Sequence, residues 1–444
     1  MAITISTPLL MSTILFILTC IPIPSFSCPS HQKQALLHFK STLTTTISSS
    51  SYHMVQLKSW NPTSDCCSWE RVNCTETKTI TELHLDGLVV PLPDIDPAPV
   101  FSDILAPLFH IRSLKLLDIS NNSLHDKIPG DGFVNLTELV HLDMKDNWFN
   151  GSIPRQLFGL TNLHYLDMSN NMLEGELGPE FGSFQNLTTL RLSYNYFKGG
   201  IPSHLFKLKS LRVLDLSDNT LKGGLSVEVG KLLNLESLIL SANFLSGKLP
   251  QEIGKLTRLR ELLLQNNQFS SGVPSSTANF KNLETLDLSQ NSFSMQIPAS
   301  IGTLPNITAV DLSNNKFTGP IPSSMQNMSK LVILGLHNNK LVGKIPTWLF
   351  SFTSLDTLFI GGKGNGLTWN NKAKFIPNYS LKFLSLISCN ISGQFPEWIS
   401  SQKRLICWRK PLIFIFIMVG FWRFDTKQWI TNRIGRHDYN SVNG

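Results

Sequence analysis

Four cysteines near the N-terminus are the residues best placed for covalent chemistry. Cys28, Cys66, Cys67 and Cys74 follow a C…CC…C pattern, which in an exported chain is typical of two disulfides. Adjacent cysteines are poor partners for each other, so the residues allow either Cys28–Cys66 with Cys67–Cys74 or the crossed pairing. A zinc site would use CxxC-type spacing and histidine partners, and neither is present. We therefore expect no metal and no cofactor.

The remaining reactive side chains do not form a catalytic pattern. The 11 histidines are scattered, and the sequence has no HExxH, GxSxG, P-loop or kinase motif. His141 and His164 fall on a predicted strand face one repeat apart, without the carboxylate and serine partners of a triad. The glycine-rich segment 361–366 has the composition of a phosphate cradle, but it lacks the Lys-Ser/Thr ending and a following helix. We predict that the chain is not an enzyme.

A group of aromatic, arginine and aliphatic side chains predicts a protein-binding surface instead, because this composition is typical of binding hot spots. The predicted ligand-binding residues are Tyr165, Arg191, Tyr194, Arg212, Ile239, Arg260, Glu261 and Leu263. Ile239 and Leu263 are expected to be exposed, although the equivalent position of most other repeats is an aspartate. We expect that row of aspartates to belong to the scaffold.

An internal repeat positions all these residues. Asparagines recur every 24 residues from Asn147 to Asn339, and the aligned unit reads LxxLxLxxNxLxGxIPxxLxxL. Such a period is typical of a solenoid, in which neighbouring units bury each other's apolar residues. We predict an α/β repeat solenoid of about 13 units over residues 80–405, with irregularities at 88–110 and 361–378.

Each unit predicts a strand, a sharp turn and a return segment. The alternation in LxL indicates a half-buried strand, and neighbouring strands would form a parallel sheet on the concave face. The Asn amide can bond the unpaired backbone groups of the turn and form a ladder. In Gly-x-Ile-Pro, as at 151–154, Gly permits a tight backbone and Pro lacks an N–H, so the convex side is expected to be 3₁₀ and extended. We expect the Asn to be replaced near 361–366, and Cys389 to be a buried turn residue in its place in the last unit.

The two ends of the chain lie outside the repeat. Residues 8–24 are apolar without Lys or Arg, and Ser25 and Ser27 are the small residues of a cleavage site, so residues 1–27 predict a signal peptide. Residues 28–79 predict a cap, with a helix over 35–43, a Ser/Thr-rich loop over 41–51, and Trp60 and Trp69 around the cysteine pair. After residue 405 the repeat register is lost, and the apolar run 411–422 is too short for an ordinary membrane span. We interpret 406–444 as a product of truncation or read-through.

The net charge of +7 is concentrated in that last segment, which from Lys403 carries eight Lys/Arg and two Asp. The rest is nearly neutral and has no basic stripe, so nucleic acid is not an expected partner. Nine Asn-X-Ser/Thr sequons agree with export and predict glycosylation. They are Asn73, Asn121, Asn135, Asn150, Asn186, Asn306, Asn327, Asn378 and Asn390.

The cap sequence 65–74 (DCCSWERVNC), preceded by ALLHFK at 35–40, resembles the N-terminal domain of plant leucine-rich repeat proteins. With the Gly-x-Ile-Pro repeats, residues 1–405 resemble the ectodomain of a plant leucine-rich repeat receptor-like protein. The resemblance implies a plant-type leucine-rich repeat horseshoe or superhelix, and it implies the pairing Cys28–Cys66 and Cys67–Cys74.

The same resemblance implies a receptor that binds a peptide, protein or microbial pattern, in defence or development, and signals through a partner kinase such as a leucine-rich repeat co-receptor. The family's further repeats, C-terminal Cys cap and membrane anchor are not in this sequence. We expect the secretory pathway, with the plasma membrane as destination for a full-length protein and the apoplast for this chain. The alternative is a secreted protein similar to polygalacturonase-inhibiting proteins, or a decoy.

Overall fold

The computed structural model describes residues 27–47, 52–54, 57–91, 99–370, 381–386, 389–392 and 407–409. The chain divides into two compact units. Unit 1 comprises Met1–Ser270 and Asn279–Lys281, and unit 2 comprises Ser271–Ala278 and Asn282–Gly444. Residues 1–26 of the predicted signal peptide and most of the predicted tail lie outside the described residues.

The cap of unit 1 begins with α2 (Ser30–Ile47), followed by β1 (Tyr52–Met54), η1 (Cys66–Ser68) and β2 (Val72–Cys74). The apolar spacing predicted this helix, and its buried face includes Leu36, Phe39 and Leu43. The predicted loop over 41–51 is wrong in its first half, because the helix continues to Ile47. Threonine hydroxyls in this last part, such as that of Thr42, donate to the backbone carbonyl four residues earlier and keep the polar sequence compatible with a helix.

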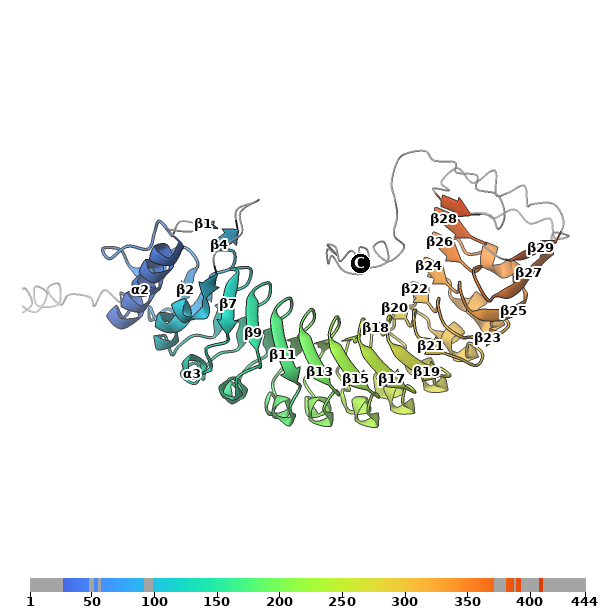
Figure 1. Ribbon diagram of the computed structural model, residues 1–444, viewed down its shortest axis with the longest axis horizontal. Coiled ribbons are helices and arrows are strands. Elements are labelled where there is room, and N and C mark those ends of the chain that lie inside the picture. The colour runs from blue at the N-terminus through green and yellow to red at the C-terminus, as the bar shows by residue number, and fades with distance from the viewer. Residues whose placement is uncertain are drawn as a thin grey trace, which may run out of the picture. The chain divides into compact units, whose positions relative to one another are not determined.

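The LxxLxL segments form a parallel first sheet, as predicted (Figure 1). In unit 1 its repeat strands are β3 (Ile80–His84), β6 (Leu116–Asp118), β8 (His141–Asp143), β10 (Tyr165–Asp167), β12 (Thr189–Arg191), β14 (Val213–Asp215), β16 (Ser237–Ile239) and β18 (Glu261–Leu263). In unit 2 they are β20 (Thr285–Asp287), β22 (Ala309–Asp311), β24 (Ile333–Gly335), β26 (Thr357–Phe359), β28 (Phe383–Ser385) and β30 (Cys407–Arg409). The central leucine of a strand, such as Leu214, is fully buried, which stabilises the fold by roughly 1.5–3 kcal/mol per residue.

A second sheet follows the turn in each repeat, where only extended segments were predicted. Its strands in unit 1 are β5 (Val100–Phe101), β7 (Leu124–Lys127), β9 (Trp148–Gly151), β11 (Met172–Glu176), β13 (Tyr196–Gly199), β15 (Thr220–Gly223) and β17 (Phe244–Gly247), and β19 (Gln268–Ser271) follows. In unit 2 the corresponding strands are β21 (Ser292–Phe293) and, in a separate four-stranded sheet, β23 (Thr318–Gly319), β25 (Lys340–Lys344), β27 (Gly366–Asn370) and β29 (Asn390–Ser392). Gly151 has φ 70°, a left-handed value that suits glycine at the end of such a strand.

Short 3₁₀ helices complete the repeats, as predicted for the convex side. In order they are η2 (Ser102–His110), the helical turn α3 (Gly130–Phe133), η3 (Arg155–Gly159), η4 (Pro179–Ser183), η5 (Ser203–Lys207), η6 (Val227–Lys231), η7 (Gln251–Lys255), η8 (Ser275–Asn279), η9 (Ala299–Thr303), η10 (Ser323–Asn327) and η11 (Thr347–Phe350). Most begin directly after the proline of the Gly-x-Ile-Pro segment, because its fixed φ leads into the first helical turn.

The repeated asparagines form the predicted ladder. Nδ2 of Asn219 donates to the carbonyls of Leu192, Leu216 and Ser217, at 2.9, 3.3 and 2.9 Å. Its Oδ1 accepts from the N–H of Phe197, at 3.0 Å. The same pattern recurs along the repeats, so each asparagine ties its own turn to the preceding repeat.

The predicted loss of this asparagine near 361–366 is wrong. Asn365 takes the position, since its Oδ1 accepts from Leu341 N at 2.9 Å and its Nδ2 donates to three carbonyls. The two additional residues of this repeat lie before the asparagine, in a turn where Gly362 and Gly364 have φ 93° and 94°. The glycine run is therefore a structural insertion that brings Asn365 back into register.

Both irregular ends add strands. β4 (Val89–Pro91) pairs antiparallel with β1 of the cap, and the proline-rich residues 92–98 beyond it lie outside the described residues. At the other end, β30 pairs in parallel with β28, with Leu384 opposite Trp408. The strand ladder thus continues past the predicted boundary at residue 405. Cys389 is free and buried, as predicted, and burial raises the pKa of its thiol to about 11.

Candidate functional site

The aspartates at the last position of the first-sheet strands are part of the scaffold, as expected. The Oδ1 atoms of Asp167 and Asp215 accept from the backbone N–H two residues later, at 2.9 and 3.0 Å. Asp287 and Asp311 do the same at 2.9 Å. These carboxylates stabilise the turn after the strand. A repeat with another residue type at this position lacks this hydrogen bond.

Arg191 takes the position of such an aspartate and belongs to a polar cluster on β8, β10 and β12. The rings of His141 and Tyr165 stack with their centroids 4.0 Å apart and their planes 1° from parallel. The Tyr165 hydroxyl donates to Asp167 Oδ2 at 3.1 Å and accepts from Arg191 Nη1 at 3.4 Å. Arg191 Nη1 also lies 3.8 Å from Asp167 Oδ2. The guanidinium is thus held by two partners while part of it stays exposed.

Burial sets the protonation of this cluster. It raises the pKa of the Asp143 carboxyl to about 6, although Lys145 Nζ lies 3.1 Å from Asp143 Oδ2. Burial, with the nearby carboxylates of Asp167 and Asp143, raises the pKa of Tyr165 to about 12. Burial also lowers the pKa of His141. At neutral pH the cluster therefore offers a neutral aromatic pair beside the arginine and lysine cations.

Ile239 and Leu263 lie directly opposite each other on β16 and β18. Ile239 is half-buried, but Leu263 is only 8% exposed, so the prediction that both are exposed is wrong for Leu263. The two form an apolar floor rather than a protruding patch. Beside them, Glu261 Oε2 accepts from Ser237 Oγ at 2.8 Å.

Charged side chains border this floor at the position before each strand. Arg212 donates from Nε and Nη2 to the two carboxylate oxygens of Glu236, at 2.9 and 3.0 Å. Arg260 lies one repeat further and is exposed. Both arginines are 24 residues from Glu236, so the repeat places opposite charges side by side.

Tyr194 follows β12 in a left-handed backbone conformation, with φ 54°. Asn or Asp fills this place in most repeats, because their side chains tolerate that conformation. A half-buried tyrosine there is strained by roughly 1 kcal/mol. Ala242 and Gln290 hold the same conformation at the equivalent position, so the turn imposes it whatever the residue.

The eight predicted site residues therefore form two groups on the first sheet of unit 1. Tyr165, Arg191 and Tyr194 lie on or after β10 and β12, and the other five lie on or beside β14, β16 and β18. Four residues of the polar cluster, His141, Asp143, Lys145 and Asp167, are not among the predicted ligand-binding residues. The 24-residue offset between His141 and Tyr165 was the signal that could have paired them. His164 is directed elsewhere, with Nδ1 2.9 Å from Asn162 O.

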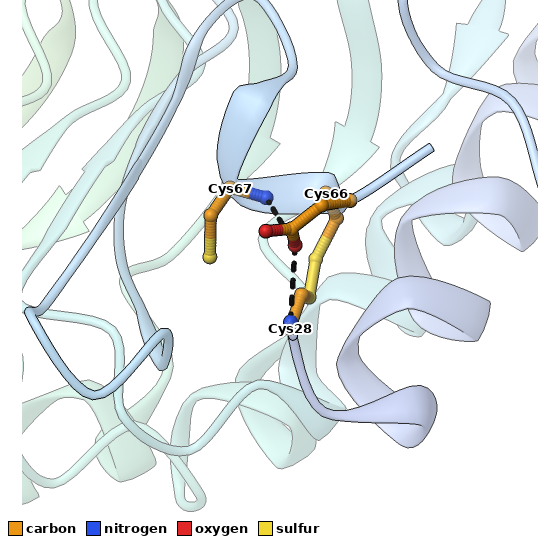
Figure 2. Close-up of side chains that lie close together, drawn as sticks. Cys28, Cys66 and Cys67 are labelled. Atoms are coloured by element: carbon orange, nitrogen blue, oxygen red, sulfur yellow. Dashed lines mark hydrogen bonds between the residues drawn. A yellow bond between two sulfur atoms is a disulfide. The ribbon is translucent and has the colours of Figure 1, made fainter. Parts of the chain in front are cut away.

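The cap contains the disulfides Cys28–Cys66 and Cys67–Cys74, the pairing that the resemblance implies. Asp65 Oδ1 accepts from the backbone N–H groups of Cys28 and Cys67, at 3.0 and 3.2 Å (Figure 2). These contacts lower the pKa of the Asp65 carboxyl, the one with Cys28 most strongly. The sulfur atoms here are in disulfides, so this group of cysteines and a carboxylate is a structural staple.

The sequons lie mostly away from the two groups of site residues. Between residues 151 and 305 the sequence has one, Asn186, which is exposed and lies between η4 and β12. Asn150 lies on the second sheet, in β9. Asn378 lies outside the described residues. Among the described residues, no sequon lies on the strands from β14 to β18.

Three family models match the chain. They are described as leucine rich repeat N-terminal domain over residues 29–75, leucine rich repeat over 112–173, and leucine-rich repeat region over 193–407. Together with the paired strands and the asparagine ladder, they make this chain a leucine-rich repeat protein with the corresponding N-terminal cap.

Its curated relatives are plant receptor-like proteins, which confirms the predicted resemblance. Receptor-like protein 46 of Arabidopsis thaliana is 40% identical over 154 residues, a match that covers 34% of this chain and 18% of that protein. Receptor-like protein 7 of the same species is 32% identical over 145 residues, covering 32% and 13%. The matched part is thus a small share of each relative.

Solved structures of plant receptors share the fold. The structure of the Arabidopsis receptor kinase HAESA in complex with the peptide hormone IDA and the co-receptor SERK1 matches with a TM-score of 0.65 and 27% identity, over 85% of this chain and 69% of that chain. The plant peptide hormone receptor RGFR1, in complex with RGF2, gives 0.63 and 27%, over 76% and 63%. Among the described residues, none of the helices combines the length and apolar composition that a membrane span requires.

Proposed function

We propose that this chain is the ligand-binding part of a plant cell-surface receptor-like protein that recognises a peptide or protein in defence or developmental signalling. The ligand lies on the first sheet of unit 1, across β10 to β18. Signalling passes through a partner kinase, such as a leucine-rich repeat co-receptor. The structures of HAESA in complex with the peptide hormone IDA and of the peptide hormone receptor RGFR1 in complex with RGF2 support this class of ligand.

The observation that carries the proposal is the change of residue type on this part of the sheet. The last position of the strand is an aspartate in most repeats. It is Arg191 in β12, Asp215 in β14, Ile239 in β16 and Leu263 in β18. The replacements put a cation at one end of the surface and an apolar floor at the other. A peptide ligand fits this arrangement with an acidic group near Arg191 and an apolar side chain over Ile239. Tyr194, held in a strained conformation, lies after the strand of Arg191.

The test is selection of a phage-displayed random peptide library on the full chain secreted from plant cells. We expect the selected peptides to lose about tenfold or more in affinity when Arg191→Ala or Ile239→Ala is introduced. Phe244→Ala is the matched control, because Phe244 is an exposed apolar residue of the second sheet. Selected peptides whose affinity is unchanged by both site variants would contradict the proposed surface.

The alternative, a secreted polygalacturonase-inhibitor-like protein or decoy, differs in location and target. Fractionation of the full natural protein separates a membrane-bound receptor from a free apoplastic protein. Inhibition of a purified polygalacturonase by the secreted chain would favour the alternative over peptide recognition.

A further inference from the structure

A row of exposed apolar side chains crosses the second sheet of unit 1. The residue directly after the ladder asparagine is Trp148, Met172, Tyr196 or Phe244 in four of the repeats, with exposed fractions of 50, 40, 57 and 53%. Trp148, Met172 and Tyr196 belong to successive repeats, and Thr220 separates them from Phe244. Apolar side chains that lie next to one another generally indicate a surface that something covers, whereas single exposed side chains do not. The row lies on a different sheet from the proposed ligand site.

One sequon lies inside this row. Trp148 and Asn150 occupy alternate positions of β9, so both side chains point to the same face of the sheet. Across the ladder, Asn150 is opposite Lys127 on β7 and opposite Met172 on β11. The acceptor asparagine therefore has an indole beside it along the strand and a thioether beside it across the strands.

His125 holds the Trp148 ring in an orientation that suits a sugar. The two rings stack with centroids 5.6 Å apart and planes 5° from parallel. Since His125 lies on β7, it covers one face of the indole, and the other face is directed toward β11. The C–H groups of a sugar ring carry partial positive charge, and an aromatic face is the negative part of the ring's quadrupole.

We propose that Asn150 carries an N-linked glycan whose first N-acetylglucosamine packs against the free face of Trp148 and against Met172. Oligosaccharyl transfer joins Asn150 Nδ2 to the anomeric carbon of a lipid-linked diphosphate oligosaccharide. The lipid diphosphate leaves, the amide gives up one proton, and one N–H remains. A covalently attached sugar is present at a high effective concentration, so weak stacking is enough to keep it in place. Like the proposed function, this proposal requires that the chain is exported. It involves none of the proposed ligand-binding residues.

The test uses the full chain secreted from kifunensine-treated plant cells, which keep their glycans trimmable. Glycopeptide mass spectrometry gives the occupancy of each sequon, and thermal unfolding gives Tm. We expect Asn150 to be occupied and Tm to be unchanged when an endoglycosidase trims the glycan to its first sugar. Asn150→Gln, which prevents attachment, is expected to lower Tm by roughly 1–3 °C.

A double-mutant cycle separates sugar stacking from ordinary packing. Trp148→Ala is expected to lower Tm in the glycosylated chain and to have little further effect in the Asn150→Gln background. Tyr196→Ala is the matched control, because it removes an equally exposed aromatic from a strand without a sequon, and its effect should add to that of Asn150→Gln. Additive effects of Trp148→Ala and Asn150→Gln would overturn the proposal, and so would an unmodified Asn150 beside an occupied Asn186. If every sequon is unmodified, the export required by the proposed function fails as well.

Discussion

Replacing one ladder asparagine by alanine tests how the repeats hold together. Asn219 is buried in the middle of unit 1 and makes four hydrogen bonds through its side chain. Asn219→Ala removes all four and changes no apolar contact of the core leucines. The loss in stability therefore reports the hydrogen bonds themselves.

The magnitude follows from what each former partner retains. The three carbonyls keep other donors, namely Asn195 Nδ2, Asn243 Nδ2 and Tyr194 N. The N–H of Phe197 has Asn219 Oδ1 as its bonded acceptor and would be left buried and unsatisfied. One such orphaned N–H costs about 1–3 kcal/mol, and the weakened carbonyl contacts add to it, so we expect a loss of about 3 kcal/mol.

Urea unfolding of wild type and variant, followed by circular dichroism, gives this difference at a matched m-value. The control is Asn234→Ala, because Asn234 makes one exposed hydrogen bond from Nδ2 to Lys209 O at 2.9 Å. We expect the control to lose less than about 1 kcal/mol. Hydrogen exchange at the Phe197 amide should accelerate in Asn219→Ala alone. Equal losses for the two variants, or an unchanged Phe197 amide, would refute the reasoning.

Three further substitutions test buried charge and backbone conformation. Burial and the adjacent Asp311 raise the pKa of Asp287 to about 7, so the folded chain binds this proton more tightly than the unfolded chain and loses stability as pH rises from about 4 to 7. Asp287→Asn keeps an acceptor for Ser289 N. Its free energy of unfolding relative to wild type, measured by urea unfolding, should therefore be more favourable at pH 8 than at pH 5. An equal difference between variant and wild type at both pH values would contradict this. Gly335→Ala should lose about 1–3 kcal/mol in the same assay, because its Cβ would lie 2.5 Å from Asp311 Oδ1; a neutral effect would show that the carboxylate moves freely. Tyr194→Asn should gain about 0.5–1 kcal/mol by relieving the left-handed tyrosine while weakening peptide binding, and a loss of stability would assign the tyrosine to the fold.

The frame of this protein could be predicted because its signals are periodic. Apolar residues, asparagines and aspartates recur every 24 residues, and each has one structural task that elementary chemistry identifies. The position of Asn365 was missed because the prediction followed the period and not the hydrogen-bonding requirement. If every repeat is required to have an asparagine amide in the ladder, Asn365 is the residue that meets this requirement in the 26-residue repeat.

The candidate site was predictable in position but less so in detail. Strand alternation places Leu263 on the outward face, yet the side chain is buried. Alternation predicts the face to which a side chain points, but it does not predict how far neighbouring side chains cover it. The stacked pair His141–Tyr165 and the ion pair Arg212–Glu236 each span 24 residues, so both could have been found by comparing equivalent positions of adjacent repeats. The second sheet depends on backbone pairing between segments with little apolar alternation, so the sequence indicated extended chain without indicating a sheet.

The turn before Asn365 also shows where this architecture accepts new length. Two additional residues are accommodated between the strand and the amide, while the strands on either side keep their register. Insertions at this point lengthen a loop at the rim of the first sheet without displacing any buried leucine. Other ladder turns should therefore accept short grafted segments, such as an epitope or a fluorophore-binding peptide, and so provide attachment points beside the ligand surface.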